Sequence, residues 1–148
     1  MAIIVLVAVV LVYHTRVSPS VPPAPAPHNS GIPVAIDGAV VQAKIADTEA
    51  LREQGLSGTQ PLAQDQGMLF VFDSPGYYSF WMKDMNYPID MIWIGADKKV
   101  VYIQPDAMPA SYPETFVSTV PAQYVIEVPD GFAKLHAIKA GDAVVFSL

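Results

Sequence analysis

Short runs of hydrophobic residues, several of them alternating with polar ones, recur from about residue 34 to the end of the chain. Runs of this length between turn residues are typical of β-strands. The pattern predicts strands at residues 40–46, 67–72, 77–83, 89–94, 100–104, 123–128 and 143–147. Short turns between the four central strands predict an antiparallel meander. About seven strands with two short helices favour a mostly β fold, a small closed or nearly closed β-barrel, because closure hides strand edges.

Two short helices and one long loop interrupt these strands. Residues 48–54 follow Asp47, which we expect to be the N-cap of a helix. A second helix is expected after Asp130, with His136 on its exposed side. Residues 105–121 contain four prolines and little periodicity, and so long a loop predicts a lid or the rim of a binding site.

The N-terminus carries a different pattern. Residues 2–12 are eleven apolar residues in succession. A membrane-spanning helix needs about 20, whereas a signal-peptide core has roughly 7–15. We expect residues 1–17 to be an apolar signal or anchor segment, with a buried element of the domain as the alternative. Residues 18–33 contain six prolines and predict a semi-rigid linker, with a PxxP ligand as the alternative.

This layout predicts where the protein acts. An apolar segment, a Pro-rich linker and an acidic β-barrel domain at residues 34–148 are typical of an extracytoplasmic protein, periplasmic or secreted. Residues 1–13 are the expected anchor in the inner membrane, and we expect no other membrane contact. The chain has no cysteine, which excludes disulfides, thiolate zinc sites and a cysteine nucleophile. We expect a monomer.

Charge and composition narrow the partners further. Fourteen acidic and eight basic residues give a net charge of −6. Binding to nucleic acid needs clustered Lys and Arg to displace counterions from phosphates, so we expect no nucleic-acid partner. The sequence has no glycine-rich nucleotide loop and no Asp-rich calcium loop, and His136 is the one histidine of the domain. It therefore predicts no cofactor and no metal site.

Charged residues inside apolar strands are the candidates for function. Lys83 and Asp90 interrupt a stretch rich in aromatic residues and methionine, and Glu127 lies between Ile126 and Val128. Strand alternation places Asp90 on the face of two isoleucines, where a carboxylate must be paired or hydrogen-bonded. The hypothesis is that Lys83, Asp90 and Glu127 converge at the mouth of the barrel, with a Lys83–Asp90 ion pair.

Two functions of different classes follow. The leading expectation is a non-enzymatic binding or accessory module for an unknown ligand or protein of the cell envelope, because six aromatic residues cluster within residues 77–93. Its candidate binding residues are Trp81, Met82, Lys83, Asp90 and Glu127. The alternative is a hydrolase-like acid–base enzyme that uses Asp90 and Glu127. A purely structural role stays open too, with Asp90 as the cap of the turn before it and Glu127 as a partner of loop amides.

Several short motifs resemble those of a known family. They are Gly67-Met68-Leu69-Phe70, Trp81-Met82-Lys83, Pro88-Ile89-Asp90, Glu127, Gly131 and Gly141-Asp142. Over about residues 40–147 the chain resembles domain-of-unknown-function family one hundred and ninety-two. The resemblance implies a small β-barrel domain of bacteria and archaea, often exported, without a settled activity. Thr59 and Asp84-Met85 stand where that family often has a basic residue and Asn-Thr, which disfavours an anionic ligand.

Overall fold

The computed structural model describes residues 31–148. Its elements are β1 (Ile32–Ile36), β2 (Ala39–Ala46), α1 (Glu49–Gln54), β3 (Gln66–Gly76), β4 (Ser79–Trp81), β5 (Ile89–Ile94), β6 (Val100–Ala107), the short 3-10 helix η1 (Pro109–Ser111), β7 (Thr115–Val117), β8 (Ala122–Pro129), α2 (Phe132–Leu135) and β9 (Val144–Val145). The expected anchor and the expected linker up to residue 30 lie outside the described residues. The last two residues of that linker belong to β1, which the pattern did not predict.

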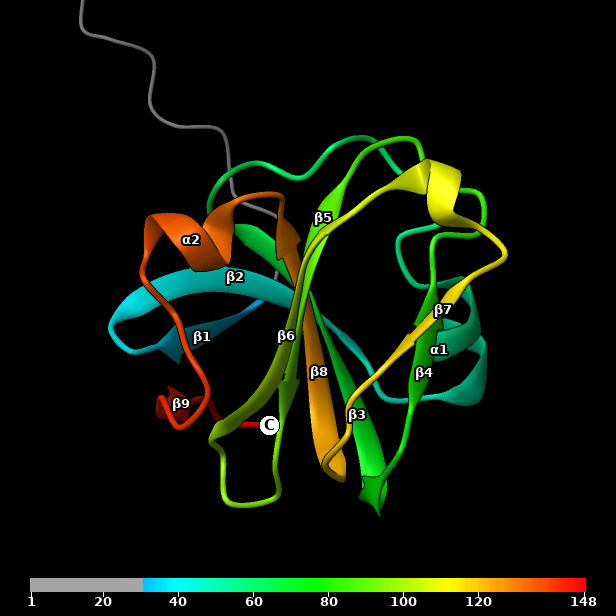
Figure 1. The fold of residues 1–148 in the computed structure, drawn as a ribbon. Helices are drawn as coiled ribbons and strands as arrows, with labels where there is room; N and C mark the ends of the chain where they lie inside the picture. Colours follow the sequence, from blue (N-terminus) through cyan, green and yellow to red (C-terminus); the bar gives the residue numbers. More distant parts are fainter. Residues whose placement is uncertain (1–30) are drawn as a thin grey trace, which may run out of the picture.

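Seven strands form one curled sheet in the order β6-β5-β8-β3-β2-β1-β9, and β4 pairs with β7 beside it (Figure 1). The two ends of the sheet meet. The Val144 amide donates to the carbonyl of Lys98, and the Val100 amide donates to the carbonyl of Asp142, both at 2.9 Å. The predicted fold, a nearly closed barrel of about seven strands with two short helices, is confirmed.

The predicted meander is wrong. β3 pairs with β2 in parallel and with β8 in antiparallel fashion, and β4 leaves the barrel. Of the four strands predicted to form the meander, only β5 and β6 form a hairpin. β8 lies between β3 and β5. Strands that are apolar on both faces belong in the middle of a covered sheet, and this burial outweighs the short turns that suggested sequential pairing.

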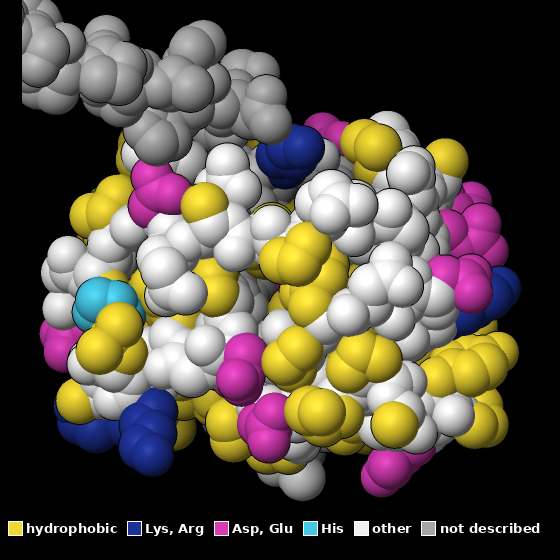
Figure 2. Space-filling model, turned by 90° about the horizontal axis from the view of Figure 1, so that it is seen from above, with side chains coloured by type: hydrophobic (Ala, Val, Ile, Leu, Met, Phe, Trp, Pro, Cys, Tyr) yellow, Lys and Arg dark blue, Asp and Glu magenta, His cyan; other side chains and the backbone are white. Residues whose placement is uncertain are grey.

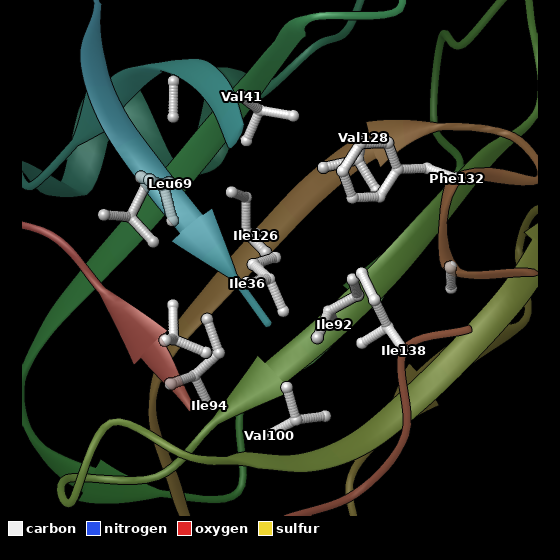
Figure 3. Close-up of a cluster of buried hydrophobic side chains, with 14 of the residues drawn as sticks. Ile36, Val41, Leu69, Ile92, Ile94, Val100, Ile126, Val128, Phe132 and Ile138 are labelled. Carbon is white, nitrogen blue, oxygen red and sulfur yellow. The ribbon is translucent and has the colours of Figure 1, made fainter. Parts of the chain in front are cut away.

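Strand alternation divides the buried side chains into two cores. The inner core fills the barrel (Figure 3) and consists of Val34, Ile36, Val41, Ala43, Leu69, Ile92, Ile94, Val100, Ile126, Val128, Phe132, Ala133, Ile138, Val144 and Phe146. The outer core lies on the other side of the wall and consists of Ala46, Leu56, Phe70, Phe80, Met82, Tyr87, Ile89, Met91, Trp93, Ala107, Ala122 and Val125. Because both faces of β5 are covered, all six of its residues are buried.

Both helices begin differently from the prediction. The N-cap of α1 is Thr48 rather than Asp47, and its hydroxyl accepts from the amide of Leu51 at 3.3 Å. The N-cap of α2 is Gly131, at φ 76°, rather than Asp130. His136 is exposed, as expected. The segment predicted as one long loop instead contains the end of β6, η1 and β7.

β3 and β8 approach closely at Gly67. A Cβ atom at this position would lie 2.8 Å from the carbonyl oxygen of Glu127. Only glycine allows two backbones to approach this closely. The tight contact fixes the part of β8 that carries Glu127.

Candidate functional site

Glu127 is a buried carboxyl group on the outer face of the barrel wall. It lies on β8, paired with Met68 of β3 on one side and Met91 of β5 on the other. The residue is 5% exposed, and its Oε2 atom has no hydrogen-bond partner among the described residues. Buried polar atoms are almost always paired in native proteins, so this oxygen marks a candidate site.

Burial also changes how Glu127 ionises. It raises the pKa of the Glu127 carboxyl from 4.5 to about 8. Nearby, the Tyr87 and Thr59 hydroxyls lie 2.7 Å apart. Burial raises the pKa of Tyr87, the hydrogen bond with Thr59 lowers it, and charge on Glu127 adds to the rise. At neutral pH the Glu127 carboxyl is therefore mostly protonated, and a bound cation would favour its charged form.

A cavity of about 270 Å³ opens beside Glu127. It lies between α1 with its following turn and β4, the elements on the right of Figure 1, and β3 contributes to its wall. The lining residues are Glu49, Arg52, Glu53, Gln54, Gly55, Leu56, Ser57, Phe70, Phe72, Tyr78, Ser79, Phe80, Trp81, Met85 and Glu127. The cavity thus combines aromatic walls with a polar helix and one buried carboxyl group.

The aromatic walls hold one another in place. The rings of Phe72 and Tyr78 stack with their centroids 3.5 Å apart, and those of Phe70 and Phe80 meet edge to face at 4.8 Å. The indole nitrogen of Trp93 donates to the carbonyl of Tyr78 at 3.1 Å and ties the start of β4 to the barrel. The cavity is therefore formed before any ligand arrives, as most small-molecule sites are.

The charged residues of the wall come from α1. Glu49, Arg52 and Glu53 line the cavity. The Nη1 atom of Arg52 donates to the carbonyl of Asp47 at 2.7 Å and to that of Val71 at 2.9 Å. The guanidinium is thus engaged by the backbone, whereas both glutamates are exposed.

Three predicted binding residues lie next to one another on or after β4. Trp81 lines the cavity and is 47% exposed. Met82 is buried in the outer core. Lys83 is exposed, with its Nζ atom 5.7 Å from the centre of the Trp81 ring, and its carbonyl accepts from the hydroxyl of Ser57 at 2.8 Å. Of the three, only Trp81 reaches the cavity.

Asp90 faces the inside of the barrel, away from this cavity. Register pairs Asp90 with Val128 and Met91 with Glu127, so the two carboxyl groups point to opposite faces of the sheet. Asp90 is fully buried. Its Oδ1 accepts from the amides of Asp106 at 3.0 Å and Gly131 at 3.3 Å, and its Oδ2 accepts from the amide of Ala133 at 2.9 Å. Asp90 thus joins β5 to β6 and to the start of α2.

The predicted convergence of Lys83, Asp90 and Glu127 is therefore wrong. Asp90 is enclosed beneath α2, Glu127 lies on the other face of the wall, and Lys83 is exposed beside Trp81. For the same reason, the predicted Lys83–Asp90 ion pair is wrong. The prediction that Asp90 and Glu127 act together in acid–base chemistry is wrong as well. The structural alternative for Asp90, a cap of the turn before it, is wrong too, because the carboxylate accepts from amides of β6 and of the start of α2.

An exposed apolar surface adjoins the cavity. Tyr112 is 46% exposed and meets the ring of Trp81 at 6.0 Å, and Met108 is also 46% exposed. Figure 2 shows hydrophobic side chains gathered in the right half of the view, over the end of the molecule that carries η1. Trp81 is the residue that joins this surface to the cavity.

Sequence reasoning missed most of the cavity wall. The apolar neighbours of Glu127 identified it as unusual, but no pattern in residues 49–57 relates α1 to β8. Phe70 and Phe72 look like ordinary core residues of a strand, and only the fold turns them towards a cavity. In residues 31–148 no three His, Asp or Glu side chains gather as ligands for a metal ion. No helix in that range is long and apolar enough to cross a bilayer.

Comparison with known families agrees with the fold. The sequence profile of DUF192, described as Uncharacterized ACR, matches residues 32–146. The chain belongs to the DUF192 family. The resemblance inferred from its motifs is confirmed, and DUF192 is itself uncharacterised.

Solved structures similar to this DUF192 protein include the following two. A protein of unknown function from Novosphingobium aromaticivorans DSM 12444 is 32% identical, with a TM-score of 0.73 over 85% of this chain and 94% of the other. A protein from Sinorhizobium meliloti 1021, provisionally described as a transcription regulator, is 30% identical, with a TM-score of 0.73 over 78% of this chain and 92% of the other. None of the curated proteins compared with the chain matches it.

Proposed function

We propose that this DUF192 domain is a non-enzymatic binding module that takes part of a cell-envelope molecule into the cavity beside Glu127. The observation that carries the proposal is the unpaired Oε2 atom of Glu127 at a cavity with aromatic walls. Ligand sites are mostly apolar concavities with a few convergent polar groups. A buried oxygen without a partner gains free energy when a ligand supplies the missing hydrogen bond.

The size of the cavity limits what can enter it. Its volume of about 270 Å³ is close to the lower end of the roughly 300–1,000 Å³ that small-molecule sites occupy. A side chain or terminal group of a larger molecule fits this space better than a whole glycan does. The half-exposed ring of Trp81 at the mouth would stack against the part that stays outside.

Ligand binding is the first expected result. Among short peptidoglycan fragments and glycans, we expect at least one to raise the unfolding temperature and to shift the amide resonances of β3, β4 and α1. Trp81→Ala should weaken that ligand about fivefold, because an aromatic contact contributes roughly 1 kcal/mol. Tyr77→Ala is the matched control, since Tyr77 is exposed but does not line the cavity. No shift with any fragment would contradict the proposal.

The choice of envelope ligands depends on location. We propose that residues 1–17 carry the domain out of the cytoplasm and hold it at the inner membrane, with residues 18–33 as a spacer. Their support is the run of eleven apolar residues followed by six prolines. Cell fractionation should then find the full chain in the membrane fraction and open to protease added to spheroplasts. A chain without residues 1–17 should stay in the cytosol, and a cytosolic full chain would rule the location out.

One observation favours an enzyme as the second candidate. A carboxyl group with a pKa of about 8 is suited to general acid–base catalysis near neutral pH. Asp90 is not available as its second carboxylate, because it points to the other face of the sheet. Chemical conversion of an envelope fragment, abolished by Glu127→Gln while the fragment still binds, would replace the binding module by an enzyme.

Gene regulation by direct DNA contact has less support. The provisional description of the Sinorhizobium meliloti relative raises that possibility for the present chain. Residues 31–148, however, contain seven basic against fourteen acidic residues. That balance repels a phosphate backbone, so the sequence-based expectation of no nucleic-acid partner is retained as part of the proposal.

A further inference from the structure

We propose that the group recognised in this cavity is an alkylammonium, a primary amine at the end of an apolar stem, with its nitrogen held by the Glu127 carboxylate. This ligand class depends on the binding role proposed above and makes it more specific. Terminal amines of diamino acids and polyamines have this chemistry. Three features of the site favour it over neutral or anionic ligands.

The first feature is the missing partner of Glu127. Its Oε2 atom has no hydrogen-bond donor among the described residues. Burial, which removes the carboxyl group from water, is the cause that raises its pKa. An ammonium supplies both a donor and the opposite charge, and hydrogen bonds between ionised groups are the strongest that a carboxylate makes.

The second feature is the wall around the carboxyl group. Phe70 and Phe80 are buried, Tyr78 and Trp81 are more exposed, and all four line the cavity. Ring faces attract cations, and ring edges and faces also pack against methylene groups. A stem of methylene groups with a terminal ammonium matches both properties.

The third feature is the charge at the rim. Glu49 and Glu53 line the cavity from α1, and both are exposed. The cation there, Arg52, is engaged by two backbone carbonyls. Two carboxylates against one tied guanidinium attract a cation and repel an anion.

We attribute the expected pH dependence of amine binding to Glu127 and not to the other ionisable groups around it. Tyr87 faces it from the segment before β5, and its pKa is raised from 10.0, so the hydroxyl stays neutral near pH 7. Tyr78 lies just before β4, and the charged groups of α1 are those of the rim. Lys44 of β2 pairs with Met68, and Met68 in turn pairs with Glu127, so Lys44 is separated from Glu127 by one strand. Lys44 lines a different cavity.

The test uses the domain with three probes of similar size: n-butylamine, 1-butanol and butyrate, titrated by heteronuclear NMR. At about pH 8 we expect the amine to bind at least about tenfold more tightly than butanol, and butyrate not to bind. Because binding needs the charged carboxyl with a pKa of about 8, amine affinity should rise about 50-fold between about pH 6 and pH 8.

Two variants sharpen the test. Glu127→Gln keeps the shape but not the charge, and should lower amine affinity about tenfold or more and abolish its pH dependence. Glu114→Gln makes the same change outside the cavity and should leave both unchanged. If Glu127→Gln does not fold, the pH dependence of the unmodified domain still decides the question.

The possible outcomes separate the ligand class from the binding role. If butanol binds as tightly as the amine, or if amine affinity does not rise with pH, the alkylammonium assignment is overturned while the binding module stands. If neither these probes nor any envelope fragment shifts the resonances of the cavity, both proposals fall. Amine binding that responds equally to Glu127→Gln and Glu114→Gln would also overturn the assignment, because it would come from net charge alone.

Discussion

Replacing Asp90 by alanine is expected to lower the free energy of unfolding by about 3–5 kcal/mol. The side chain is fully buried and accepts from three backbone amides, those of Asp106, Gly131 and Ala133. Alanine would leave all three donors without this acceptor and would open a gap beneath α2. Urea unfolding followed by tryptophan fluorescence measures the loss.

Two further variants serve as controls for the expected effect of Asp90→Ala. Asp73→Ala removes an exposed carboxylate from β3 and should change stability by less than about 0.5 kcal/mol. Asp90→Asn keeps one carbonyl acceptor but turns an amide donor towards other donors, so its loss should be intermediate. If Asp90→Asn were as stable as the unmodified protein and instead lost ligand binding, the structural role assigned to Asp90 would be wrong.

The stability of the domain is expected to fall as the pH rises from about 5 to about 8, and Glu127 is the cause. In the unfolded chain this carboxyl ionises near its ordinary pKa of 4.5, whereas in the folded protein its pKa is about 8. Between these values the folded state binds more protons than the unfolded state, so stability decreases with pH. The slope approaches about 1.4 kcal/mol per pH unit, and the whole change is roughly 4–5 kcal/mol.

Glu127→Gln removes the titrating group and should flatten this dependence. At about pH 8 the variant should be more stable than the unmodified protein, and near pH 5 the difference should shrink or reverse. Urea unfolding at several pH values measures both curves. Glu114→Gln is the control that keeps the slope, since Glu114 is exposed. Parallel curves for the unmodified protein and Glu127→Gln would show that Glu127 does not carry the effect.

Local pattern predicted single strands well and their partners poorly. The predicted strand at residues 89–94 coincides with β5, and the one at residues 123–128 lies within β8. The strand predicted at residues 77–83 shrinks to three residues, because β4 leaves the barrel to pair with β7. Alternation is a property of a few consecutive residues, whereas pairing depends on which distant strand covers an apolar face.

The candidate site divides in the same way. The sequence singled out Asp90 and Glu127, since each is a carboxylate in an apolar strand. Strand alternation placed Asp90 correctly with Ile92 and Ile94, which lie in the inner core. Nothing local showed that α2 would supply amides to Asp90 or that the face of Glu127 would be covered by α1 and β4.

By itself, the sequence determined the fold class and the family of this protein, and it identified two acids, Asp90 and Glu127, inside apolar strands. It could do so because side chains alternate between two faces along each strand and because charge inside an apolar run is unusual. The tertiary structure alone decided what each acid does. The register between β5 and β8 points Asp90 into the barrel, where its carboxylate accepts from three backbone amides. The same register points Glu127 outward to the cavity, where its Oε2 atom has no hydrogen-bond partner among the described residues. The difference arises because contacts between segments far apart in the chain determine whether a buried carboxyl group is satisfied.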